Sequence, residues 1–220
     1  EIVVVLNRCT DRTEDVVRGR AKIVREDASN LARIRNAGAA AATGEILVTI
    51  DADSRMSENM LEEIDRAMRS GRTIGGGVPV KAERLSLGIL TTGLLLAIPF
   101  MVRRLSAGLF WVARRDYEAM GGFDEHYVMA EDYHFARRLK EFGRKRGLKF
   151  GTLWRTHIVT SCRKFDRLGD WFVWRMILRR PGFLVEAFRG RNTDMADRYW
   201  YEYGNSETDE SRQGKIGGAE

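Results

Sequence analysis

The chain has 220 residues, of which 44% are hydrophobic and 31% charged, a composition typical of a globular domain with an arm or tail and not of a disordered or fibrous protein. Two cysteines and three prolines exclude a disulfide framework and a collagen-like or proline-rich chain. The net charge of +6 indicates an anionic partner, which leaves open nucleic acid, a membrane surface or a phosphorylated small molecule. The surplus is concentrated in residues 137–180, which hold 14 basic and 3 acidic residues.

The first third of the chain alternates apolar runs with amphipathic segments. The runs at 2–6 and 46–50 are continuous and aliphatic, which is typical of strands buried on both faces of a parallel sheet. The helices expected between them are a short one at 13–18, one capped by Ser29 and ended by Gly44, and one capped by Ser57 and ended near Gly71. This order predicts an α/β fold with a mostly parallel central sheet flanked by helices.

The middle of the chain contains an uncharged run of 18 residues at 85–102. A membrane-spanning helix needs about 20 predominantly apolar residues, and this run includes Pro99 and several Gly, Ser and Thr residues. We therefore expect a buried helix here, or a helix that lies on a membrane surface.

The remaining expected elements are a strand at 109–113, a helical turn at 116–120, a helix from about Asp132 to Gly143 and a strand at 149–153. Residues 166–203 are expected to form an amphipathic, aromatic-rich helical arm. Residues 204–220, rich in Gly, Ser, Asp and Glu, are expected to be a disordered tail.

The clearest candidate site is Asp51-Ala52-Asp53, directly after the strand expected at 46–50. Ligands of open α/β sheets bind outside the carboxyl ends of the strands. Two carboxylates placed there repel each other unless a cation lies beside them. Mg²⁺ or Mn²⁺ fits such oxygen ligands and commonly bridges to substrate phosphates. The alternative is a strand that simply ends in a polar turn.

Three further features could carry chemistry. In the pair Glu131-Asp132, either one carboxylate is a general base aimed at an acceptor hydroxyl, or Asp132 is a helix cap and Glu131 is solvated. Arg163 and Lys164 either clamp a diphosphate or belong to a basic solvated face. His157 is either an ordinary surface or core histidine or a metal ligand.

Taken together, these segments resemble the family 2 glycosyltransferases, which have the GT-A fold. The resemblance rests on the strand and polar turn at 1–13, the "A-R-I-R-N-A-G" helix at 32–38 with "A-T-G-E" at 42–45, the Asp-x-Asp motif at 51–53, the strand at 108–115, the "G-G-F-D-E" turn at 121–125 and the "E-D" pair at 131–132. It covers about residues 1–165, which we expect to form the glycosyltransferase domain. The family opens with one more strand and helix, so we expect this first unit to be missing from the domain.

The resemblance also implies a role for each matching residue. Asn7 and Asp11 would lie near the nucleotide base and ribose, and Arg35 and Asn36 near the base or the diphosphate. Asp51 would touch the ribose or the metal, and Asp53 would bind the metal with His157. Asp132 would be the general base, and Gly108 and Glu131 would lie beside it on the acceptor side.

The implied reaction is metal-dependent transfer of a sugar from a UDP- or GDP-type donor to an acceptor hydroxyl, with inversion and with Mg²⁺ or Mn²⁺ as cofactor. Two other functions stay open: a non-catalytic nucleotide- or glycan-binding module of the same fold, and a basic nucleic-acid-binding protein. Against the nucleic-acid-binding alternative, the sequence contains neither zinc-finger spacing nor an RNA-recognition motif. We expect a cytoplasmic protein, with contact to the inner face of the membrane and a homodimer left open.

Overall fold

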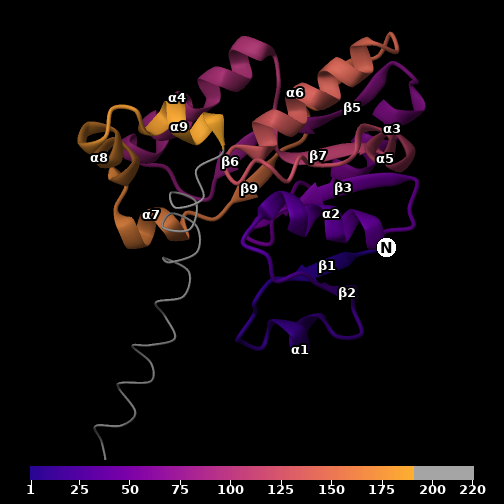
Figure 1. The fold of residues 1–220 in the computed structure, drawn as a ribbon, viewed down its shortest axis with the longest axis horizontal. Helices are drawn as coiled ribbons and strands as arrows, with labels where there is room; N and C mark the ends of the chain where they lie inside the picture. Colours follow the sequence, from indigo (N-terminus) through magenta and orange to yellow (C-terminus); the bar gives the residue numbers. More distant parts are fainter. Residues whose placement is uncertain (191–220) are drawn as a thin grey trace, which may run out of the picture.

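The computed structural model describes residues 1–190, and Figure 1 shows their arrangement. The first half of the chain contains β1 (Val3–Leu6), α1 (Thr13–Val17), β2 (Lys22–Arg25), α2 (Leu31–Ala41), β3 (Ile46–Ile50), β4 (Ser54–Met56), α3 (Met60–Arg69), β5 (Thr73–Val78) and β6 (Val80–Ala82). The second half contains α4 (Leu87–Arg103), β7 (Ala107–Ala113), α5 (Arg114–Met120), α6 (Glu131–Arg144), β8 (Lys149–Thr152), β9 (Ile158–Thr160), α7 (Arg163–Leu168), α8 (Phe172–Arg179) and α9 (Phe183–Arg189).

The sheets are mixed in direction. β1 and β2 pair in parallel, as a strand–helix–strand unit requires. The larger sheet has the order β3-β7-β5-β8, in which β5 and β8 are parallel but β7 is antiparallel to both of its neighbours. β3, β5 and β8 thus run in the same direction, which agrees with the expected mostly parallel sheet, and β7 is the antiparallel strand within it. A small third sheet has the order β4-β9-β6.

Strand β5 carries three consecutive glycines, Gly75, Gly76 and Gly77, all buried in the middle of the large sheet. A Cβ atom on Gly76 would lie 1.7 Å from the carbonyl oxygen of Gly151 in β8. The glycines thus let β7 and β8 approach β5 more closely than side chains permit.

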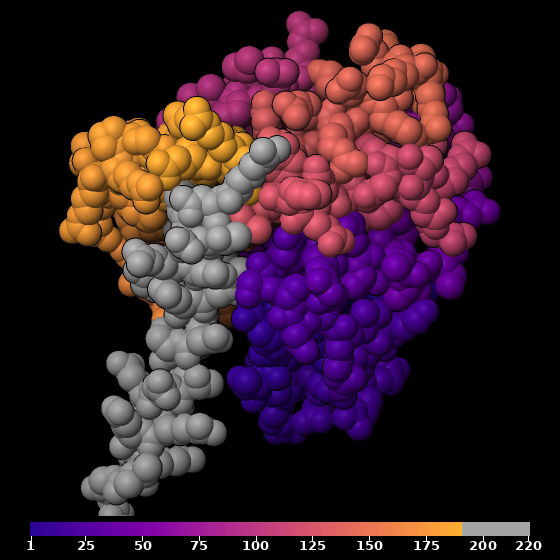
Figure 2. All heavy atoms as spheres, viewed as in Figure 1, coloured from indigo at the N-terminus to yellow at the C-terminus, as the bar shows by residue number. Residues whose placement is uncertain are grey.

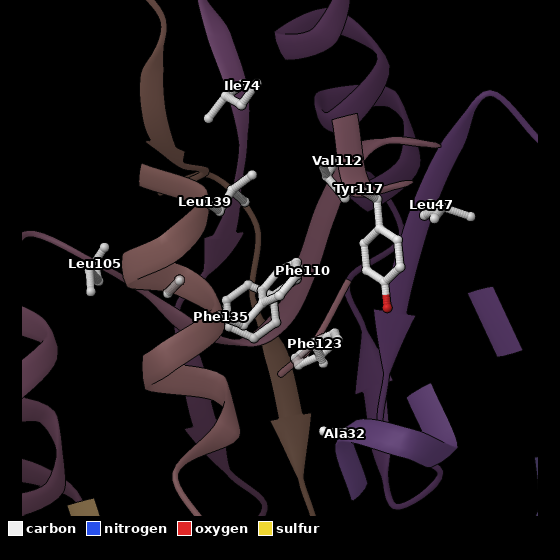
Figure 3. Packing of buried hydrophobic residues seen from close by; sticks show 11 residues of the cluster. Ala32, Leu47, Ile74, Leu105, Phe110, Val112, Tyr117, Phe123, Phe135 and Leu139 are labelled. Atoms are coloured by element: carbon white, nitrogen blue, oxygen red, sulfur yellow. The ribbon is translucent and has the colours of Figure 1, made fainter. Parts of the chain in front are cut away.

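The main core lies between α6 and the large sheet. Three aromatic rings pack together here (Figure 3): Phe110 in β7, Phe123 in the turn before α6, and Phe135 in α6. The ring centroids of Phe123 and Phe135 are 4.0 Å apart. Ala32 of α2 is fully buried in the same cluster. This packing fixes the first turn of α6 beside α2, which is where the candidate site forms.

The uncharged run at 85–102 forms α4, whose N-terminus is capped by the Ser86 hydroxyl accepting a hydrogen bond from the amide of Ile89. Gly88, Ile89 and Thr92 are buried against the domain. Among the described residues, no helix combines the length and the apolar character needed to cross a membrane.

Helix boundaries differ in detail from those expected. Asn30 caps α2, because its side-chain oxygen accepts the amide of Arg33, and Ser29 lies one residue outside. Helix α3 begins at Met60, so Ser57 does not cap it. Helices α7, α8 and α9 occupy the described part of the expected arm, whereas residues 191–203 and the tail expected at 204–220 lie outside the described residues.

Candidate active site

The centre of the candidate site is the side chain of Arg35, which α2 projects toward the large sheet. Its guanidinium donates hydrogen bonds to Asp51 at 2.8 Å, to Glu131 at 2.9 Å and to Asp132. Asp51 follows β3, while Glu131 and Asp132 open α6. The Arg35 junction, defined as these four residues, therefore joins the Asp-x-Asp motif to the "E-D" pair, 80 positions further along the chain.

The Arg35 side chain at the centre of the junction is 9% exposed, whereas that of Asp51 is 42% exposed. Burial on its own would lower the pKa of Arg35, but the charges of Asp132, Glu131 and Asp51 outweigh it and hold that pKa above its usual range. The guanidinium also lies 5.1 Å from the ring centre of Phe123, a favourable cation–π geometry. Arg35 is therefore a permanent, fixed positive charge among three carboxylates.

The two acidic residues at the start of α6 differ in environment. Burial raises the pKa of Glu131 to about 7, with the nearby Asp132 adding to the shift and Arg35 opposing it. The Glu131 side chain is 11% exposed and that of Asp132 26%. Of the pair, Asp132 is thus the one more open to an incoming molecule, and both sit at the helix end whose dipole favours negative charge.

Asn36 uses its whole side-chain amide inside the protein. Its oxygen accepts hydrogen bonds from the hydroxyl of Tyr117 at 2.6 Å and the amide of Phe123 at 2.9 Å. Its nitrogen donates to the carbonyl of Phe123 and to the carboxylate of Glu125, both at 2.9 Å. Asn36 therefore holds the "G-G-F-D-E" turn against α2. The sequence motifs do not predict this structural contact.

Asp53 lies at the start of the small sheet, on an exposed turn. Its carbonyl accepts the amide of Ser161 at 3.1 Å, because β4 and β9 pair with Ser54 opposite Thr160. The half-buried Lys164 follows in α7, and burial lowers its pKa to about 8 while the charge of Asp53 opposes that shift. The structure thus brings Asp53 and Lys164 together, with Arg163 exposed beside them.

His157 is not brought to the same place. It lies at the other end of β9, where its amide donates to the hydroxyl of Ser57 at 3.3 Å. Ser161, whose amide is hydrogen-bonded to Asp53, follows His157 by four positions. Four positions correspond to about 13 Å along an extended strand. Within residues 1–190, no group of three or more His, Cys, Asp or Glu side chains is arranged to hold a metal ion.

The remaining predicted residues, Asn7, Asp11 and Gly108, make their contacts outside the Arg35 junction. The side-chain amide of Asn7 donates hydrogen bonds to the backbone carbonyls of Glu26 and Ala28, so it ties the end of β1 to the loop after β2. The exposed Asp11 accepts hydrogen bonds from Thr13, which lowers the pKa of its carboxyl. Gly108, with φ of +85°, starts β7, and a Cβ there would lie 2.5 Å from Val80.

Comparison with known proteins adds family information to this geometry. Residues 1–92 match the family model described as Glycosyl transferase family 2. The mannosyltransferase PcManGT from Pyrobaculum calidifontis, solved with GDP-Man and Mn²⁺, is similar with a TM-score of 0.59 and 23% identity over 86% of this chain and 54% of that one. S. aureus TarS 1-349, solved with UDP-GlcNAc, is similar with a TM-score of 0.55 and 15% identity over 73% of this chain and 49% of that one. The search of curated proteins found no match.

The chain spans about half the length of these two solved structures. The likeness to them concerns the fold, because the identities are low, whereas the family match rests on the sequence itself. Residues 1–92 thus match the glycosyl transferase family 2 model, and the described chain has the GT-A fold, as the motifs predicted.

Proposed function

We propose that this chain carries the site for transfer of a sugar from a UDP- or GDP-type nucleotide diphosphate sugar to an acceptor hydroxyl, with inversion. The observation that supports this most directly is the Arg35 junction, because one buried guanidinium joins a donor-side motif to an acceptor-side motif. Similar folds have been solved with GDP-Man and Mn²⁺ and with UDP-GlcNAc, which agrees with a nucleotide-sugar donor.

Asp132 is the base of this proposal. Its carboxylate is partly exposed and lies at the N-terminus of α6, next to Asp51 across Arg35. The acceptor oxygen forms a bond to the anomeric carbon, the bond from that carbon to the diphosphate breaks, and the hydroxyl proton passes to Asp132. Attack from the face opposite the diphosphate inverts the anomeric centre. Such general base catalysis contributes about 10²–10⁴-fold to a rate.

The donor side of the proposal consists of carboxylates and cations. Mg²⁺ and Mn²⁺ commonly need only one or two protein carboxylates when phosphate oxygens and water complete the shell, so Asp53 and Asp51 fit as the protein ligands of such an ion. When bound, the ion would neutralise charge on the departing diphosphate. Lys164 and Arg163 would add fixed positive charge beside Asp53.

The rest of the donor pocket comes from the first part of the chain. We assign Asn7 and Asp11 to the nucleotide base and ribose, since both lie in the loop that follows β1. Figure 1 shows β1 on the same side of the molecule as β3, the strand that precedes the Asp-x-Asp motif. Arg35 and Asn36 act mainly by holding Asp51, Asp132 and the "G-G-F-D-E" turn. Gly108 and Glu131 belong to the acceptor side. The proposal also includes a cytoplasmic location for the protein.

The test is release of nucleoside diphosphate from a panel of UDP and GDP sugars, with Mn²⁺ and with a set of hydroxyl acceptors. We expect Asp132→Asn to reduce transfer at least 100-fold with unchanged donor affinity, because amide nitrogen cannot accept the proton. The matched control is Asp15→Asn on α1, an exposed change of the same chemistry far from the junction.

Three outcomes separate the alternatives. Near-normal transfer by Asp132→Asn contradicts its role as the base. Donor binding without any transfer by the unaltered chain supports a binding module instead. Steeply salt-dependent binding of DNA or RNA without donor binding supports the nucleic-acid alternative.

A further inference from the structure

Helix α4 exposes a continuous row of apolar side chains. Leu87, Leu90, Leu94, Ile98 and Met101 are between 47% and 72% exposed. They follow one another at intervals of three or four residues, so they share one face of the helix. This row, called here the α4 stripe, runs most of the length of a helix of 17 residues, about 25 Å.

Gly88, Thr91 and Phe100 anchor α4 to the domain. Gly88 packs so closely on the backbone of Asp170 that a Cβ would lie 2.6 Å from its carbonyl oxygen. The indole of Trp174 in α8 donates to the hydroxyl of Thr91 at 3.1 Å. Phe100 packs edge-on against Tyr133 of α6, with ring centroids 5.5 Å apart. The position of the helix is therefore fixed, and the α4 stripe remains uncovered by the described residues.

The charge around the α4 stripe indicates what it contacts. No Asp, Glu, Lys or Arg occurs from residue 85 to residue 102, and the exposed Arg103 and Arg104 follow at once. The neighbouring α8 adds the exposed Arg179, and Trp171 and Leu178 are exposed at its two ends. Figures 1 and 2 show α4, α8 and α9 gathered on one side of the molecule, apart from β1 and β2.

We propose that the α4 stripe docks on the surface of a lipid bilayer with anionic headgroups, with α4 lying along the interface. An apolar face with arginines and a tryptophan at its edges matches the acyl and headgroup layers of such a surface. A second copy of this chain fits less well, because an interface that pairs the same surface on both copies would bring one set of arginines against the other.

Docking in this way gives the proposed function a class of acceptor. Phe100 contacts Tyr133, the residue directly after Asp132. A helix is roughly 10–12 Å across, so a bilayer on the α4 stripe lies about one helix width from the start of α6. The acceptor hydroxyl would then belong to a molecule held in the membrane. This last step rests on the proposed function, whereas the docking itself does not.

Vesicle sedimentation of the 220-residue chain, without any donor sugar, tests the docking. Vesicles contain phosphatidylcholine alone or with 30% phosphatidylglycerol. We expect binding to the anionic vesicles, weaker binding to the neutral ones, and an at least tenfold loss for the double variant Leu94→Glu, Ile98→Glu. Leu61→Glu on α3, equally exposed but outside the α4 stripe, is the control and should bind normally. Circular dichroism checks that each variant is folded.

Absence of binding to anionic vesicles, or equal loss of binding in the control, overturns the proposal. A dimer in solution that the double variant abolishes, without lipid binding, assigns the α4 stripe to a second copy instead. Vesicle binding by a chain that releases no nucleoside diphosphate from any donor supports the docking and contradicts only the glycosyltransferase proposal.

Discussion

At the scale of single residues, the Arg35 junction concentrates the most information. A guanidinium offers five donors in a planar fork, whereas a lysine ammonium is a single point of charge that cannot reach Asp51, Glu131 and Asp132 together. We expect Arg35→Lys to lower sugar transfer at least tenfold, and Arg35→Gln to lower the free energy of unfolding by about 3 kcal/mol because three carboxylates lose their cation. Urea unfolding and donor turnover measure the two effects. Arg33→Lys on the same helix, with an exposed side chain, should change neither, and an equal effect there would contradict the assignment.

Glu131 makes a second prediction, about pH. Its pKa is raised from 4.5 to about 7, so between these values the folded chain holds a proton that the unfolded chain has lost. Stability from this group is complete below about pH 4.5 and is lost as pH rises through 7. We expect Glu131→Gln, which imitates the protonated form, to gain stability relative to the unaltered chain at pH 8 but not at pH 5, by about 3 kcal/mol at most. Urea unfolding at both pH values measures the difference in the free energy of unfolding. An equal gain at both pH values would show that the pKa of Glu131 is not raised.

At the scale of elements, two glycines have opposite surroundings. Gly76 in β5 has no room for a methyl group, because its Cβ would lie 1.7 Å from the Gly151 carbonyl. Gly93 in α4 has no atom within 4 Å of its Cβ position. We expect Gly76→Ala to destabilise the chain by roughly 3 kcal/mol or more through strain between β5 and β8, and Gly93→Ala to stabilise it by about 0.5–1 kcal/mol. Thermal unfolding of both variants measures the contrast, and a tolerated Gly76→Ala would contradict the close pairing of these strands.

The same elements show how far the sequence predicts the fold. The strand expected at 46–50 is β3 with the same bounds, because an aliphatic run between a helix and two aspartates leaves little choice. Strand β5 is not predicted, since its three glycines have low strand propensity and are explained only by the approach of β8. The small sheet β4-β9-β6 is also missed, because its strands have three residues each and their partners are distant in sequence, as Ser54 and Thr160 are.

The candidate site is predictable in its parts and not in its assembly. Local motifs identify Arg35, Asp51 and Asp132 separately. Their meeting depends on packing between residues 97 positions apart, such as Arg35 and Asp132, which no local pattern encodes. The separation of His157 from Asp53 depends likewise on the register of β9 against β4.

At the scale of the whole molecule, much of the basic surplus in residues 137–180 holds the fold together. Arg138 donates to the carbonyls of Met120 and Gly122, and Lys140 to that of Arg103. Arg146 pairs with Asp116 at 2.6 Å. The surplus therefore says less about an anionic ligand than the composition indicates, although the charge of Lys164 does interact with that of Asp53.

A ligand that binds only the folded chain stabilises the whole molecule, which gives a test independent of turnover. At 100 times its dissociation constant, a bound nucleotide adds about 2.7 kcal/mol to the free energy of unfolding, and for a chain of this size that raises the melting temperature by roughly 5–10 °C. We expect such a rise with UDP or GDP in the presence of Mn²⁺, and a smaller one without the ion. Asp53→Asn should remove the part that depends on Mn²⁺, because it removes the exposed carboxylate of the proposed metal site.

Glu62→Gln on α3 is the matched control, since it neutralises an exposed carboxylate away from the site and should leave the rise unchanged. Equal stabilisation with and without Mn²⁺ would contradict the metal role of Asp53. Stabilisation by neither nucleotide at millimolar concentration would contradict donor binding by these 220 residues. Because the readout is the melting of the chain, it separates a site that binds nucleotide without turnover from a chain that binds none.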